Sequence, residues 1–99
     1  MIRWYATYTQ SGMELWARSN LWERGYEVYL PRYLKRRRHA RRTDWVPRPL
    51  FSRYLFVRAD PERGGTRGID YAPGVVHLLR MGQLPSAVPD QIIREIQGR

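Results

Sequence analysis

The sequence predicts an α+β fold in which helices pack on an antiparallel sheet. Segments rich in aromatic and β-branched residues are separated by turn residues, and two segments carry helical start and stop signals. In chain order they read as strand, helix, three strands, loop, strand and helix, which is the pattern of an α+β sandwich. The 99 residues suffice for one domain that buries about two-thirds of its unfolded surface. We therefore treat residues 1–99 as a single domain.

The first strand and the first helix lie near the N-terminus. Residues 4–9, "WYATYT", combine aromatic and β-branched side chains and precede turn residues. Ser11 and Glu14 have the spacing of a capping box, and Gly25 stands where a helix would stop, so a helix is predicted over residues 12–24. Helical periodicity gives it a core stripe of Met13, Ala17 and Leu21, with Trp16 at the margin and with Leu15 and Trp22 on nearly the opposite face.

A long hairpin with a basic tip is predicted over residues 28–47. Residues 26–34 form a strand in which Pro31 indicates a sheet edge or a bulge. The next segment, "KRRRHARR" (residues 35–42), is polar and lacks periodicity, and "TDWVP" resumes an extended pattern.

The next strand lies in "RPLFSRYLFVRAD", residues 48–60, and is apolar on both faces. With a period of two, Leu55 and Val57 share a side with Phe51, and Tyr54 and Phe56 share the other side with Leu50. Helices could cover such a strand on both sides, as in many sandwiches, or one face could wait for a partner. From the residues alone, both readings stay open.

The C-terminal third should contain a loop, a strand and a helix. "DPERGGTRGID" (residues 60–70) is rich in turn residues and should be mainly loop, with a short helix before the Pro73–Gly74 turn. "GVVHLLRMG" (residues 74–82) reads as the last strand. "VPDQIIREI" (residues 88–96) opens a helix with Pro89 and Asp90 in its first turn, as the helix dipole prefers.

Several classes of protein do not fit the composition. The chain has no cysteine, and its two histidines, His39 and His77, lie too far apart to suggest a metal site. No apolar run approaches the roughly 18 residues of a membrane span, and a signal-peptide core is absent, so we expect a soluble intracellular protein. We see no carboxylate pair or nucleophile–base set, and "GGTRG" lacks the ending of a phosphate loop. We expect neither an enzyme nor a cofactor.

The charge indicates a nucleic-acid partner. The formal net charge is +9, and residues 1–50 carry 11 basic and 4 acidic side chains against 7 and 5 in the remainder. Almost all the basic side chains are arginine, whose planar fork suits phosphate. The predicted phosphate contacts are those of the hairpin tip: Lys35, Arg36, Arg37, Arg38, Arg41 and Arg42. A merely solvated tip is the alternative, and a nuclear-localisation signal has less support.

The order of several motifs resembles the N-terminal (NGN) domain of the NusG family of transcription elongation factors. The matching segments are "WY" at 4–5, "YLP" at 29–31, "PLFSRYLFVR" at 49–58, "GVVHLLR" at 74–80 and "VPD" at 88–90. The spacing around them is closest to the specialised, RfaH-like antitermination factors.

The resemblance implies an NGN-type sandwich with a four-stranded antiparallel sheet flanked by helices. It also implies that the protein docks as a monomer onto the β′ clamp helices of bacterial RNA polymerase and thereby reduces pausing and termination. The protein would then act in the bacterial cytoplasm, at the nucleoid. The positions that match the family's docking surface are Tyr8, Tyr54 and Phe56, and Phe51 and Met81 are expected beside them. The family's continuation, a small KOW-type β-barrel domain, has no counterpart in residues 1–99.

Two further contacts are implied less completely. The family's threonine- or serine-rich loop, which faces the β subunit, falls at Thr66 and Arg67, and only the threonine is kept. Members that read the non-template DNA strand use residues around the first helix, where this chain offers Gln10, Asn20 and Arg24.

Two alternatives remain. Leu15 and Trp22 are either ordinary exposed or loop-covered side chains or, beside Arg18 and Arg24, a platform on which bases of single-stranded DNA stack. The whole chain could instead be a standalone nucleic-acid-binding module of the ribosomal or chromatin type.

Overall fold

The computed structural model describes residues 1–98, and its centre is a five-stranded antiparallel sheet. The strand order is β2 (Glu27–Tyr29), β5 (Tyr54–Ala59), β1 (Arg3–Thr9) and β6 (Val75–Leu78), with β9 (Ala87–Val88) also paired to β1. The expected number of four strands was wrong, since the sheet has β9 as a fifth strand. Strand β9 pairs with Trp4 and Tyr5, beyond the part of β1 that pairs with β6.

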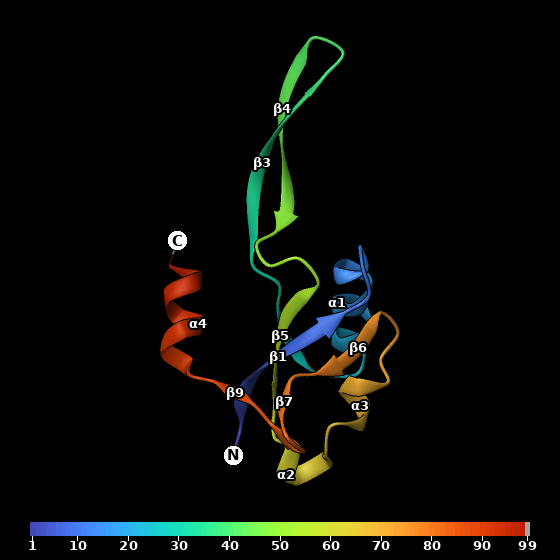
Figure 1. Cartoon of the computed structure of the whole chain (residues 1–99), viewed down its shortest axis with the longest axis vertical. Helices are drawn as coiled ribbons and strands as arrows, with labels where there is room; N and C mark the ends of the chain where they lie inside the picture. Colours follow the sequence, from blue (N-terminus) through green and yellow to red (C-terminus); the bar gives the residue numbers. More distant parts are fainter. Residues whose placement is uncertain (99) are drawn as a thin grey trace.

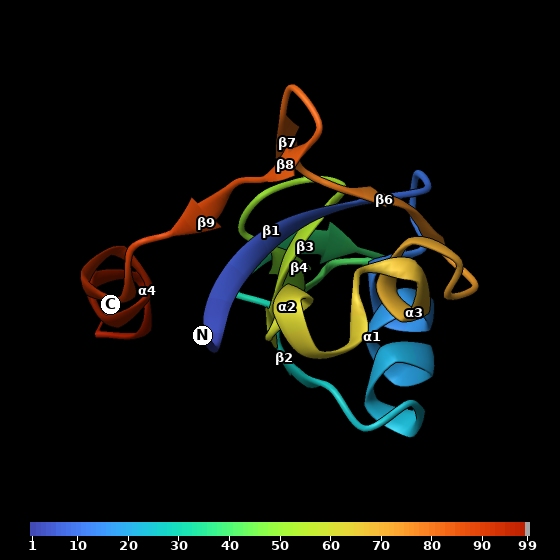
Figure 2. The ribbon, with the colours of Figure 1, turned by 90° about the horizontal axis from the view of Figure 1, so that it is seen from below.

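One face of the sheet forms the core with α1 (Glu14–Glu23) and α3 (Arg67–Asp70), which lie together in Figure 2. Leu55 and Val57 are fully buried there, as period two predicts. The helices contribute Ala17, Leu21 and Ile69, which are also fully buried. Within residues 1–98, α1 and α3 leave the other face of the sheet uncovered, and the C-terminal helix α4 (Asp90–Gln97) contacts the sheet at β1.

Helix α1 is shorter than predicted and lacks the capping box. Its N-cap residue is Met13, without a side-chain cap, and Glu14 is buried and accepts a 2.9 Å hydrogen bond from the Arg53 amide instead. Because Glu14 takes the inward position at the start of the helix, Met13 is exposed, and the expected core stripe holds only for Ala17 and Leu21.

The predicted stop of this helix at Gly25 is confirmed. Gly25 has a φ of +89°, and its amide donates to the Trp22 carbonyl at 2.9 Å. The Tyr26 amide donates to the Leu21 carbonyl at 3.1 Å, which completes a Schellman motif.

The chain leaves the sheet after β2 and forms a separate ribbon of β3 (Arg32–His39) and β4 (Arg42–Pro49). The break falls at Leu30 and Pro31, since proline cannot donate a ladder hydrogen bond. The ribbon projects along the long axis of the molecule (Figure 1), which measures 53 Å against 28 and 25 Å for the other axes. Its two-residue turn, Ala40–Arg41, has positive φ at both positions, as in a type I′ turn.

Strand β5 begins at Tyr54, four residues later than the apolar run suggested. Residues 50–53 form a turn in which Arg53 has a φ of +67°, and Phe51 meets Phe56 there, so the period-two placement of Phe51 on the core side was wrong. The Arg53 carbonyl accepts from the Thr9 amide at 2.8 Å, and its amide donates to Glu14, so the turn is fastened to β1 and α1.

Residues 60–97 form the remaining helices and strands of the domain. The loop at 60–70 contains α2 (Pro61–Gly64), capped by Asp60, as well as α3. The expected last strand is divided into β6 and β7 (Arg80–Met81), and β7 pairs with β8 (Leu84–Pro85) in a small hairpin. The predicted C-terminal helix is confirmed as α4 (Asp90–Gln97), which lies beyond β9 on the opposite side from α1 (Figures 1 and 2).

Candidate functional site

The sheet face opposite α1 and α3 carries a cluster of aromatic side chains. Tyr8 pairs with Tyr54 in the β1–β5 ladder, and Phe56 pairs with Ala6 on one side and Tyr29 on the other, so these rings share a face. We call the cluster the aromatic face, and it comprises Tyr8, Tyr29, Phe51, Tyr54, Phe56 and His77.

The rings of the aromatic face contact one another in two groups. The Tyr8 centroid lies 5.2 Å from that of Tyr54 and 5.9 Å from that of His77, both tilted. The Phe56 centroid lies 6.3 Å from that of Tyr29 and 6.2 Å from that of Phe51, which meets it edge-on. These separations are those of favourable aromatic pairs.

Exposure differs sharply within the aromatic face. Tyr8, Tyr29 and Tyr54 are half-buried and Phe51 is 41% exposed, whereas Phe56 is only 7% exposed. Phe56 was expected to wait for a partner, and the structure leaves little of its ring accessible because Tyr29 and Phe51 pack on it. It forms the floor of the cluster, and its neighbours offer the accessible surface.

The turn at 50–53 explains the position of Phe51. Because Arg53 turns the backbone into the left-handed region, Phe51 swings over Phe56 instead of continuing the alternation of β5. Tyr29 was not among the sequence-derived candidates. Period two could have found it, since "YLP" ends the strand that pairs with Phe56.

A cation borders the aromatic face. The Arg53 guanidinium lies 4.3 Å from the centroid of the Tyr8 ring, a cation–π geometry. Its Nε donates to the Thr9 carbonyl at 3.1 Å, which holds the side chain in place. A partner that docks on Tyr8 would therefore meet a fixed positive charge.

The other predicted docking residue, Met81, lies outside the cluster. It is 78% exposed on β7, in the small hairpin with Leu84, which is 73% exposed. The fold thus places two exposed apolar side chains on a projection next to β6 (Figure 2).

The Thr66 hydroxyl is used inside the domain. It donates to Asp70 Oδ2 at 2.9 Å and accepts from Arg80 Nη2 at 2.8 Å, and Arg80 also forms an ion pair with Asp70. Burial alone would raise the pKa of Asp70, but the hydrogen bonds from Arg80, the Leu78 amide and Thr66 outweigh it and lower that pKa. Arg67 is exposed and lies 5.8 Å from the Tyr71 ring centroid.

The predicted nucleic-acid residues of α1 also make internal contacts. Asn20 Nδ2 donates to the carbonyls of Trp16 at 2.8 Å and Pro73 at 3.4 Å. Arg24 Nη1 donates to the Gly68 carbonyl at 2.9 Å. Both side chains therefore tie α1 to the α3 region, and the charge of Arg24 remains at the surface.

The β3–β4 ribbon concentrates the charge of the molecule. Residues 32–49 contain eight basic side chains and one acidic side chain, a net charge of +7 out of the +9 of the whole chain. Arg37 forms a two-contact ion pair with Asp44 at 3.0 and 3.2 Å. Among residues 1–98 the ribbon makes no other ion pair, and the predicted contacts at its tip are all exposed: Lys35, Arg36, Arg38, Arg41 and Arg42.

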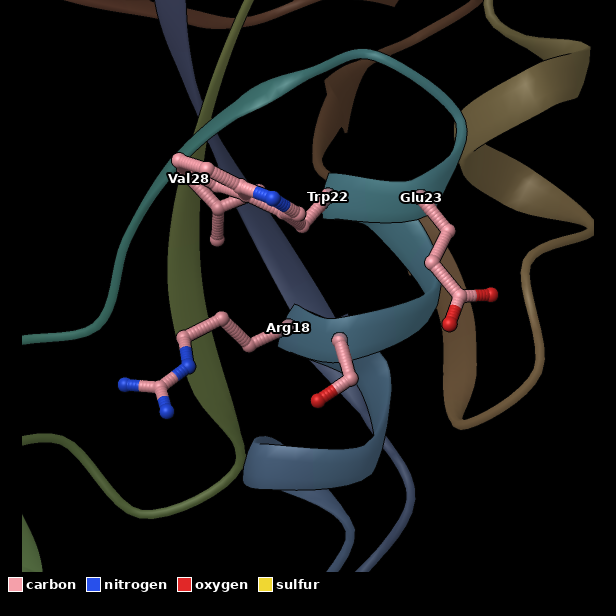
Figure 3. A pocket seen from close by; sticks show the side chains of 5 residues that line it. Arg18, Trp22, Glu23 and Val28 are labelled. Atoms are coloured by element: carbon pink, nitrogen blue, oxygen red, sulfur yellow. The ribbon is translucent and has the colours of Figure 1, made fainter.

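Trp22 lines two hollows beside the edge strand β2, and Figure 3 shows the first of them. One, of about 490 Å³, is lined by Arg18, Ser19, Trp22, Glu23 and Val28. The other, of about 600 Å³, shares Trp22 and Val28 and adds Gly25, Tyr26 and Glu27. Trp22 and Val28 line both hollows, and the carboxylates of Glu23 and Glu27 offset the charge of Arg18, so this place lacks the positive excess that a nucleic-acid platform needs.

Two general features follow from residues 1–98. They contain no group of three metal-ligating side chains that could hold an ion. Over the same residues, no helix is both long and apolar enough to cross a membrane.

A protein-family model described as "Transcription termination factor nusG" matches residues 2–97. The chain belongs to the NusG family. Among solved structures, one titled "Domain interaction in Thermotoga maritima NusG" superposes with a TM-score of 0.68 at 23% sequence identity. The match covers 97% of this chain and 55% of the Thermotoga chain, so this chain spans about half the length of that NusG. The mixed α+β fold with antiparallel sheets is therefore a NusG fold.

Proposed function

We propose that this chain is a non-enzymatic transcription elongation factor domain that binds the clamp helices of the RNA polymerase β′ subunit through the aromatic face. The observation that carries the proposal is that Tyr8, Tyr54 and Phe51 stay partly accessible to solvent on the sheet face opposite α1 and α3. Tyrosine suits this role because its ring buries apolar area while its hydroxyl stays hydrated or finds a partner. Membership of the NusG family supports the same partner.

The mechanism is a shift of equilibrium. A factor that binds the elongating form of the polymerase more tightly than the paused form favours elongation by the ratio of the two affinities. This reduces pausing and termination without a chemical step in the factor itself. The spacing of the flanking motifs supports assignment to the specialised RfaH-like branch.

The ribbon adds a contact with nucleic acid of the elongation complex, and its net charge of +7 supports this. A weaker second polymerase contact, with the β subunit, would rest on the exposed Arg67, since the Thr66 hydroxyl is already paired with Asp70 and Arg80.

The concentrated charge of the ribbon also favours one different function, that of a standalone nucleic-acid-binding module. A pull-down with the 99-residue chain at moderate salt separates the two functions. Retention of polymerase that depends on the aromatic face supports the first, and retention of nucleic acid alone supports the second.

A clamp-helix fragment provides the direct test. Tyr54→Ala should weaken its binding by about 30-fold, the effect of losing an interface hot spot, with an unchanged far-UV circular dichroism spectrum. The control is Trp22→Ala, which removes an exposed aromatic ring beside β2 and should leave the affinity unchanged. Wild-type affinity of Tyr54→Ala would exclude the aromatic face as the docking site.

A further inference from the structure

The two faces of the β3–β4 ribbon differ in chemistry. Directly paired residues of an antiparallel ladder point to the same side, and the side alternates at each step. One face, which we call the tryptophan face, carries the pairs Arg32–Pro49, Leu34–Pro47, Arg36–Trp45 and Arg38–Thr43. The opposite face carries Tyr33–Arg48, Lys35–Val46, Arg37–Asp44 and His39–Arg42.

The charge on the tryptophan face is entirely positive. The only acidic residue of the ribbon, Asp44, lies on the opposite face, where Arg37 neutralises it. Three arginines share the tryptophan face, and Arg36 is the direct cross-strand partner of Trp45. Neighbouring pairs on one face are about 6.8 Å apart along the ribbon, so Arg38 lies one such step from Trp45.

Trp45 is a poor candidate for a structural role. It is 60% exposed, and its neighbour on the same face, Leu34, is 62% exposed. The ribbon projects away from the sheet (Figure 1), and the hydrophobic core of the described residues, 1–98, includes no side chain of the ribbon. A large aromatic ring that stays in water among arginines has the composition of a base-stacking site.

We propose that Trp45 stacks on an unpaired base of single-stranded nucleic acid while Arg36 and Arg38 bind the neighbouring phosphates. This inference rests on the proposed contact between ribbon and nucleic acid and names the face and the form of nucleic acid. Charge alone would attract a duplex equally well, but a duplex already stacks its bases on each other. An exposed indole gains its stacking contact only where a base face is free.

The comparison with Trp22 shows what distinguishes this site. Trp22 is equally accessible, at 68% exposure, but Glu23 and Glu27 border its hollows. It therefore serves as a matched control: an exposed tryptophan on the same molecule beside which Glu23 and Glu27 offset the charge of Arg18.

The test measures binding of the 99-residue chain to three oligonucleotides of one sequence: single-stranded DNA, single-stranded RNA and duplex DNA. Trp45→Ala should weaken binding to at least one single strand by about fivefold to 100-fold. Its affinity for the duplex should change by less than twofold, and Trp45→Phe should restore most of the single-strand affinity. Trp22→Ala should behave as the wild type with all three. The DNA and RNA arms identify which single strand the site prefers.

Salt dependence separates stacking from charge. Trp45→Ala should leave the log–log salt slope unchanged, whereas Arg36→Ala and Arg38→Ala should each lower it by about 0.7 on single strands. Unaltered single-strand affinity of Trp45→Ala, or equal loss on single strand and duplex, would overturn the inference and leave the ribbon's proposed contact intact. Absence of any binding by the wild-type chain would overturn both.

Discussion

Replacement of Phe56 by alanine tests how much the burial of this ring within the aromatic face contributes to the stability of the fold. The Phe56 residue is only 7% exposed to solvent, because the rings of Tyr29 and Phe51 pack on it. Loss of a buried phenyl ring costs about 3–5 kcal/mol, and we expect about 3 kcal/mol because the exposed Phe51 ring can move into part of the space. In a domain of this size each kcal/mol lowers Tm by about 4–8 °C, so Phe56→Ala should lower it by about 12–24 °C.

Thermal unfolding followed by far-UV circular dichroism measures this loss. Tyr54→Ala is the control, since its half-buried ring should cost less than half as much. Phe56→Leu, which keeps most of the volume, should cost about 1 kcal/mol. A Tm loss for Phe56→Ala no larger than that for Tyr54→Ala would refute the assignment of Phe56 as the floor of the cluster. Tyr54 is therefore the better residue for probing binding.

Two further predictions concern the framework that holds the aromatic face. Gly74→Ala should destabilise the fold by at least about 1 kcal/mol more than Gly82→Ala in urea titrations: both glycines have positive φ, but a Cβ on Gly74 would meet the Ala17 nitrogen at 2.9 Å, whereas one on Gly82 meets nothing. Equal losses would contradict the close packing of Gly74 on α1. The pKa of Asp70 is lower in the folded protein than its usual 3.8, so its ionised form stabilises the fold above about pH 4, and this contribution disappears as the pH falls through the folded pKa. Asp70→Asn should therefore cost about 1.5–3 kcal/mol at pH 7 and lose stability less steeply than the wild type below pH 4, and parallel pH profiles would contradict the network.

The sequence predicted those features that depend on local periodicity. Leu55 and Val57 were correctly placed in the core because their strand alternates regularly once β5 has begun. Gly25 ended the helix because only the left-handed conformation completes its Schellman motif. The family motifs identified the NusG family independently of these details.

The features that sequence reasoning missed depend on contacts between distant residues. Glu14 looked like a capping residue, but the amide that it satisfies belongs to Arg53, 39 positions away. The same turn reverses Phe51, which no local pattern reveals, because arginine rarely adopts a positive φ.

The sides of the ribbon could not be assigned from its composition. A shift of the register by one residue would have moved Trp45 to the other side from Arg36, and the register of a hairpin depends on the length and type of its turn. That turn consists of Ala40 and Arg41, which carry none of the usual Asn-Gly signal.

The uneven distribution of charge has a kinetic consequence. With seven of its nine net charges at one end of a 53 Å long body, the molecule has a large electric dipole along its long axis. Near a polyanion such a dipole turns the molecule before contact, so that productive collisions become more frequent and their rate falls as salt is added. The protein would thus approach nucleic acid with its ribbon in front. The orientation of the aromatic face toward its own partner would then be set before contact, while the molecule is still diffusing.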